Sequence, residues 1–357
     1  MRIKQTWLVM LLAILVLFRA APAQGAEEGW ESRLELRIWG FDLAYSRQGA
    51  PLFSGVDTHY FFSAGGGYQT FGFYREADNK AYTPPQKGEN LALYRNANLT
   101  WSAGLRQGVL YDLARRRNLV DLVLIFNGRY DHHFTEKNPG ALLFASDLPD
   151  RDGGWQNSLL AGLVYDGVDV NRERCLKHGV YAEVSVETAP PFLGNGSTGA
   201  DYTRLNGTVM GFLTLQEGRE VSIYLADRVM YDYLTGNYIP VRARTTFGGY
   251  SKYPAATRGL GGGFRGVEED RFDGYIKALN NLELRINFPR WSEYGVVPEV
   301  IFYFDAGLYD DLTRRLDFDR VMTSLGVGVG LSDLIVYGNY FLNEQQFSIT
   351  LALGIHF

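Results

Sequence analysis

The sequence predicts an all-β fold: a transmembrane antiparallel β-barrel, which we expect to have sixteen strands. Aromatic residues make up 14% of the 357 residues, and glycine is plentiful at 41. The carboxyl-terminal segments alternate strictly between apolar and polar residues, and no apolar run after the amino terminus is long enough for a membrane helix. Each strand of a membrane barrel is apolar on one face only, which keeps the mean hydropathy of the chain near neutral.

The amino terminus predicts a secretory signal peptide over residues 1–23. A positively charged start is followed by the apolar run LVMLLAILVLF at 8–18 and by the small residues APA at 21–23. This order is typical of a signal cleaved by a peptidase, here before Gln24. An uncleaved anchor helix is the less favoured alternative, because the apolar run is shorter than the ~20 residues that span a bilayer. We therefore expect one barrel domain over 24–357.

The carboxyl end, FSITLALGIHF, predicts a closing strand. Its residues alternate with the period of two that is typical of a β-strand, and its second face is small and polar, as the inside of a barrel would be. The chain also stops on an aromatic residue, which resembles the recognition signal that outer-membrane barrels present to the barrel assembly machinery. The apolar face of this expected assembly signal consists of Phe347, Ile349, Leu351, Leu353, Ile355 and Phe357.

Four segments before this strand repeat the alternation: 275–288, 296–309, 320–332 and 334–343. A soluble β-sandwich would alternate in the same way, with its apolar faces in a core. Charged residues such as Glu283 and Asp305, however, fall in the middle of the polar faces. Charges at that position favour a barrel, since they can be solvated or paired inside a wet bore.

Further upstream, nine segments are expected to form strands. Two of them, 55–76 and 89–112, are long enough to hold two strands each, so that nine to eleven strands precede the five described above. Sixteen strands in total suit spans of about ten residues with mixed short and long connections. The nine segments lie near 33–46, 55–76, 89–112, 118–134, 155–168, 178–190, 202–216, 219–233 and 238–248.

One loop, between the expected strands at about 238–248 and 274–289, has an unusual composition. It contains GGGFRGVEEDRF at 261–272, which is too polar for a membrane strand. Glycines in such a passage suit a loop that runs close beside a barrel wall, because they add no bulk. We expect this loop to fold into the barrel.

Three stretches together resemble the BamA, TamA and two-partner-secretion transporter superfamily of outer-membrane β-barrels, also called bacterial surface antigens. The loop motif matches Phe264, Arg265 and Gly266, followed by Val267 where the family usually has Phe or Tyr. An inward glutamate on the next strand matches Glu283. An aromatic-x-Asp-x-Gly motif on the strand after that matches Tyr303, Asp305 and Gly307. The resemblance covers residues 250–357 and implies that the arginine meets both carboxylates inside the barrel, with five strands after the loop.

Elementary geometry favours the same pairing. Neighbouring antiparallel strands lie about 4.8 Å apart. Two carboxylates on adjacent strands can therefore flank one guanidinium, whose five donors form a planar fork. The alternative is an exposed surface loop with Arg265 in water.

Nothing in the sequence predicts an enzyme, and no catalytic residue, metal site or cofactor is expected. His132 and His133 are adjacent on one expected strand, so they point to opposite faces and do not predict a metal site. The net charge of −5 disfavours nucleic acid as a partner, and the lone Cys175 cannot form an internal disulfide.

The resemblance implies a protein of the bacterial cell outer membrane that assists translocation or insertion of protein or lipid there. Members of the family carry periplasmic POTRA modules before the barrel; here the first strand is expected about ten residues after the cleavage site, so we expect a short member without them. Expected partners are outer-membrane lipids and a periplasmic partner protein or client polypeptide. The alternatives are a passive porin-like or plugged structural barrel without a client and, less favoured, an outer-membrane enzyme.

Overall fold

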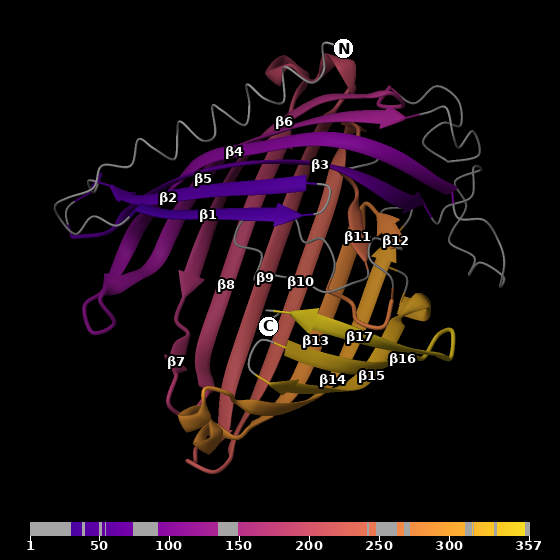
Figure 1. Ribbon diagram of the computed structural model, residues 1–357. Coiled ribbons are helices and arrows are strands. Elements are labelled where there is room, and N and C mark those ends of the chain that lie inside the picture. Colours follow the sequence, from indigo (N-terminus) through magenta and orange to yellow (C-terminus); the bar gives the residue numbers. More distant parts are fainter. Residues whose placement is uncertain are drawn as a thin grey trace.

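The computed structural model describes residues 30–37, 40–49, 52–53, 55–73, 92–134, 149–240, 243–247, 263–267, 272–310, 316, 318–331 and 334–353. Nearly all of these residues form one antiparallel sheet (Figure 1). The strands are β1 (Trp30–Arg37), β2 (Gly40–Gly49), β3 (Thr58–Phe73), β4 (Ala92–Asp112), β5 (Arg117–Phe134), β6 (Gly153–Asp166), β7 (Asp169–Asn171), β8 (Leu176–Ala189), β9 (Asp201–Gln216), β10 (Ser222–Tyr238), β11 (Thr245–Phe247), β12 (Phe272–Gly274), β13 (Ile276–Asn287), β14 (Pro298–Asp310), β15 (Met322–Leu331), β16 (Leu334–Phe341) and β17 (Gln346–Leu353). Short 3₁₀ helices are η3 (Pro191–Leu193), η4 (Asn195–Ser197), η6 (Pro289–Tyr294) and η7 (Phe318–Arg320).

The hydrogen-bonded order follows the sequence. It runs β1-β2-β3-β4-β5-β6-β8-β9-β10-β13-β14-β15-β16-β17, with β7 pairing beside β8 and with β11 and β12 in a separate two-stranded sheet. Figure 1 shows the large sheet strongly curled, with β1 and β17 at its two ends. The described residues thus place 14 strands in succession, and the expected total of sixteen is not confirmed. The five strands expected after the loop are β13 to β17.

Two of the expected upstream strands differ from the structure. The segment expected at 33–46 is a hairpin, in which Arg37 pairs with Gly40. A connection of two residues reverses the parity of the alternation: the register pairs Leu34 with Leu43 and Leu36 with Phe41, and this change of phase is a sequence signal that the prediction missed. The segment at 238–248 was wrong as a strand of the sheet, because β10 already extends to Tyr238 and β11 pairs only with β12.

The segments 55–76 and 89–112 each contain one long strand, β3 and β4, rather than two. The glycines at 65–67 in β3 resemble a turn in sequence. They are nevertheless paired on both sides, Gly65 with Asp42 of β2 and with Thr100 of β4. A Cβ on Gly65 would lie 2.3 Å from Oδ1 of Asp42, so the neighbouring strand covers this glycine closely. The glycines here allow close packing and do not end the strand.

The two faces of the sheet have opposite character. On β15, Leu325, Val327 and Val329 are exposed on the outer face, whereas Ser324 on the inner face is buried. Charged residues are buried along the inner face of many strands, among them Asp121, Glu183, Arg228, Glu283 and Asp305. The predicted placement of mid-strand charges on the inside is therefore confirmed for Glu283 and Asp305.

Aromatic rings gather on the outer face of β4, β5 and β6. The rings of Trp101 and Trp155 lie 5.5 Å apart, and those of Tyr130 and Trp155 lie 4.9 Å apart. The last strand continues the apolar outer face, because Phe347, Ile349 and Leu351 are all exposed. The side chain of Leu353, together with Ile355 and Phe357, lies outside the described residues.

The connections at the two ends of the sheet differ in length. Those at 113–116, 217–221 and 332–333 are short, while those at 74–91, 135–152 and 239–275 are long. Short turns at one rim and long loops at the other are typical of outer-membrane barrels. Among the helices in the described residues, none has the length and apolarity to cross a bilayer.

Candidate functional site

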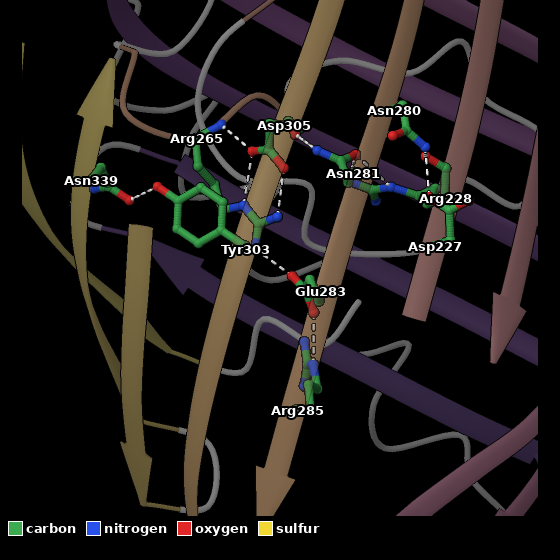
Figure 2. A network of polar contacts seen from close by, with 11 residues as sticks. Asp227, Arg228, Arg265, Asn280, Asn281, Glu283, Arg285, Tyr303, Asp305 and Asn339 are labelled. Carbon is green, nitrogen blue, oxygen red and sulfur yellow. Dashed lines mark hydrogen bonds and ion pairs between the residues drawn. The ribbon is translucent and has the colours of Figure 1, made fainter. Parts of the chain in front are cut away.

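A cluster of charged side chains lies on the inner face of β13 and β14, where the segment 263–267 meets the wall (Figure 2). Glu283 lies on β13 and Asp305 on β14. The register pairs Asp305 with Asn281, two residues before Glu283, so the two carboxylates are diagonal neighbours on adjacent strands. Both carboxylates point at the same guanidinium, that of Arg265.

Asp305 holds Arg265 through three hydrogen bonds. The backbone N–H and Nε of Arg265 both donate to Oδ2, at 3.0 and 2.9 Å, and Nη2 donates to Oδ1 at 2.6 Å. Nη1 donates to Oε1 of Glu283. The Arg265 side chain is 5% exposed, and those of Glu283 and Asp305 are 2% and 0% exposed. The predicted pairing of this arginine with both carboxylates is present in the structure, and the exposed-loop alternative is not.

Further charges extend this cluster along the wall. Nε of Arg285 donates to Oε2 of Glu283 at 2.7 Å, and its Nη1 lies 3.6 Å from Oε2 of Glu299. With Arg228 nearby, three guanidinium groups face three carboxylates on this part of the wall. Opposite charges are needed side by side in a buried cluster, because an unpaired charge there would cost several kcal/mol.

Tyr303 supports the guanidinium from the side. The Cζ atom of Arg265 lies 3.7 Å from the centre of the Tyr303 ring, within the range of a cation–π contact. The Tyr303 hydroxyl donates to Oδ1 of Asn339 on β16. Nδ2 of Asn339 in turn donates to Oγ1 of Thr350 on β17 at 3.1 Å. A continuous path of contacts therefore runs from the loop arginine to the last strand of the sheet.

Two glycines let the loop segment lie against the wall. Gly263 and Gly266 have φ of +110° and +83°, which disfavour any side chain. A Cβ on Gly266 would lie 2.8 Å from Oγ of Ser324 on β15. The carbonyl of Gly263 accepts a hydrogen bond of 2.8 Å from Nδ2 of Asn281, so the main chain is held before the arginine as well.

Apolar side chains seat the loop around the charged pairs. Phe264 is fully buried, and its ring lies 6.0 Å from that of Phe341 in an edge-to-face arrangement. Val267, which departs from the family pattern, is 8% exposed and packs in the same cluster. Gly307 lies between Leu279 and Met322 in the register. The cluster consists of Met230, Phe264, Val267, Leu279, Met322 and Phe341, with Tyr309 packed against it.

Several residues of this site were not predicted as members. Arg285 shares the inner face and lies two residues from Glu283, which is the one sequence signal that could have found it. The contacts of Arg228, Asn281 and Asn339 depend on strand register, which the alternation does not give. The site as a whole can fix a loop to the wall; in the part of the chain that is described, no group of three His, Cys, Asp or Glu side chains could hold a metal ion.

Comparison with known proteins supports the fold only. No family model and no curated protein matches the sequence. Among solved structures, the crystal structure of BamA from Haemophilus ducreyi lacking POTRA domains 1–3 is similar, with a TM-score of 0.53 and 14% sequence identity. The match covers 91% of this chain and 64% of that chain, so this chain spans less than two thirds of its length. The chain therefore has a BamA-like β-barrel fold.

Proposed function

We propose that this chain is a bacterial outer-membrane barrel that assists the insertion or translocation of polypeptides, or of lipid, at that membrane. The single observation that carries the proposal is the buried clamp of Arg265 by Glu283 and Asp305. Such a clamp costs desolvation and needs matched partners on three segments, which is more than a loop requires merely to cross the surface. In the family that the sequence resembles, this motif belongs to barrels that transport or insert proteins.

The location of the clamp supports a role at the end of the sheet. Contacts through Tyr303, Asn339 and Thr350 connect it to β17, which ends the hydrogen-bonded order of the described strands. A terminal strand can pair with an incoming strand through its free backbone edge. We therefore propose that the clamp holds β13 to β17 in a fixed arrangement against which a client strand of a nascent barrel protein pairs.

A plugged structural barrel without a client is the second candidate, and one observation favours it. The inner face of β5 to β10 carries an apolar cluster among its polar side chains. Leu160, Met210 and Phe212 belong to it, and Phe61 of β3 packs against them. Apolar side chains packed together there would oppose conduction, so this observation favours a plugged barrel over an open porin-like pore.

The test is the folding of a defined client. A purified, urea-unfolded outer-membrane barrel would be diluted into lipid vesicles with and without this protein, and its folding rate would be followed by the electrophoretic shift on heating. We expect faster folding with the wild type, and crosslinks between the client and a photoreactive residue placed at Thr350. An exposed variant, Arg219→Ala, is the matched control and should act as the wild type does. If the client folds equally fast in empty and protein-containing vesicles and no crosslinks form, the insertion role is contradicted and the plugged structural barrel is favoured.

Two further measurements test the proposed location in the outer membrane and the alternative of an open pore. A protein of the outer membrane should fractionate with that membrane and show its own electrophoretic shift on heating. Planar bilayers containing the wild type should show no steady conductance if the apolar cluster closes the bore. Steady conductance that is abolished only by blocking substitutions on the inner face would favour the porin-like alternative.

A further inference from the structure

One carboxylate lies on the opposite, outer face of the sheet. Asp227 of β10 alternates with the buried residues Ala226 and Arg228, and it shares the outer face with the exposed Val229. Its Oδ1 accepts a hydrogen bond of 2.6 Å from Nδ2 of Asn280 on β13 (Figure 2). In the described part of the chain, no Lys, Arg or His forms an ion pair with Asp227.

The depth of this pair is given by β13, which is 12 residues long. At about 3.3 Å per residue, a tilted strand of this length crosses little more than the ~25 Å apolar band of an outer membrane. Asn280 lies four residues after Ile276 and seven before Asn287, near the middle of that span. Leu282, the register partner of Asp227, is exposed beside it. The carboxylate is therefore expected among acyl chains, where an ionisable group is costly.

One small residue, Gly211, lies directly beside the carboxylate on β9, and a second, Gly207, lies farther along that strand opposite Tyr231. Gly211 of β9 is paired with Asp227, and a Cβ added to it would meet nothing within 4 Å. A Cβ on Gly207 would meet only the carbonyl oxygen of Glu183, at 3.9 Å. Val209 and Leu213 stand exposed on either side of Gly211. On the β9 side, therefore, the register partner of Asp227 has no side chain to cover the carboxylate.

We propose that the outer wall of β9, β10 and β13 docks a membrane-spanning segment of a partner protein that carries a Lys or Arg at mid-depth. Asp227 supplies the complementary charge, Asn280 orients its carboxylate, and Gly211 allows close approach beside it, as small residues do between membrane helices. A lipid amine fits less well, because headgroups lie at the membrane surface and not at the depth of Asn280. This inference rests on the proposed membrane location and is independent of the proposed role in insertion.

The test uses a defined probe and the whole folded protein in phosphatidylcholine vesicles. The probe is a polyleucine transmembrane helix with one central Lys, compared with the same helix carrying Leu there, and association is measured by energy transfer. We expect the Lys helix to bind the wild type about five- to thirtyfold more tightly than it binds Asp227→Asn. The Leu helix should not distinguish the two proteins. Equal binding of the Lys helix to both would overturn the proposal.

Two further variants separate docking from a structural role and from charge alone. Asp227→Val should abolish the preference for the Lys helix and leave the urea midpoint of the isolated barrel unchanged or raised. A clear fall in the midpoint would mean that the contact between Asp227 and Asn280 stabilises the fold and does not serve docking. Val327→Asp places a carboxylate on the outer face of β15, and it should not increase binding of the Lys helix. If phosphatidylethanolamine vesicles abolish the preference by occupying Asp227, the ligand is a lipid amine and the proposal fails. Loss of the heat-induced shift in the wild type would instead contradict the membrane location.

Discussion

Two regions of the same inner wall are closed by different physical means. On β13 and β14 the wall is charged, and every carboxylate of the clamp has a guanidinium partner at a defined atom. On β5 to β10 the wall contains an apolar cluster, in which side chains such as Leu160 and Val164 pack together. The charge-assisted hydrogen bonds of the charged region are directional, so they select one loop. Packing in the apolar region is non-directional, so it accepts any side chains of suitable volume.

This difference predicts how each region fails. Removal of one partner from the charged region leaves another charge buried and unpaired, and packing of neighbouring side chains cannot compensate for the lost ion pair. Truncation in the apolar region leaves a cavity that neighbouring side chains can partly refill. The four changes below probe this contrast, from the largest expected loss of stability to the smallest.

Asp305→Ala should have the largest effect. It removes three hydrogen bonds to Arg265 and leaves that guanidinium with Glu283 alone. We expect a loss of about 3–5 kcal/mol of unfolding free energy, measured from the urea midpoint in vesicles. The exposed pair Arg219–Glu293 provides the control, and Arg219→Ala should change the midpoint by less than about 1 kcal/mol. If both variants shift the urea midpoint equally, the clamp contributes no more to stability than an exposed ion pair does.

Leu160→Ala tests the apolar region. Leu160 is 3% exposed within the cluster of β5 to β10, so its truncation should cost about 2–3 kcal/mol, at the low end for such a change because neighbouring side chains can partly refill the space. The neighbouring Leu159 is exposed on the outer face and gives the control, Leu159→Ala. A loss at Leu160 as large as that at Asp305 would remove the contrast between the two regions.

Gly266→Ala probes the backbone of the loop segment. The positive φ should cost about 1–2 kcal/mol, to which the contact with Ser324 adds. The double variant with Ser324→Ala relieves the contact with Oγ but keeps the strained φ, so it should recover part of the loss in urea midpoint. Full recovery would mean that crowding alone excludes a side chain at this position.

Tyr303→Phe should have the smallest effect. It keeps the ring beside Arg265 and removes the hydroxyl that donates to Asn339, a hydrogen bond worth about 0.5–1.5 kcal/mol. Tyr303→Leu removes the ring as well, and the further loss would measure the cation–π contact. Indistinguishable midpoints for the two variants would indicate that the ring contributes nothing to holding the guanidinium.

The sequence predicted the charged region far better than the apolar one. Glu283 and Asp305 could be assigned to one face because their strands alternate cleanly, and the resemblance supplied Arg265 as their partner. In β5, apolar residues occur on both faces, as Val123 and Leu124 do, so alternation could not reveal an apolar inner cluster. The hairpin of β1 and β2 was missed for a different reason, since the sequence does show a change of phase between Leu36 and Phe41 that was not read as a turn. Contacts such as Arg285 with Glu299 require the register between strands, which no single strand contains.

The carboxylate of Asp305 accepts from the main-chain amide of Arg265 as well as from its side chain. The peptide backbone is therefore fastened at this point independently of the residues that lead up to it. A protease cut between residues 248 and 262 should then yield two fragments that stay associated without a covalent link. Such a nicked protein would migrate as one folded species until it is heated, and co-expression of the two pieces should rebuild it.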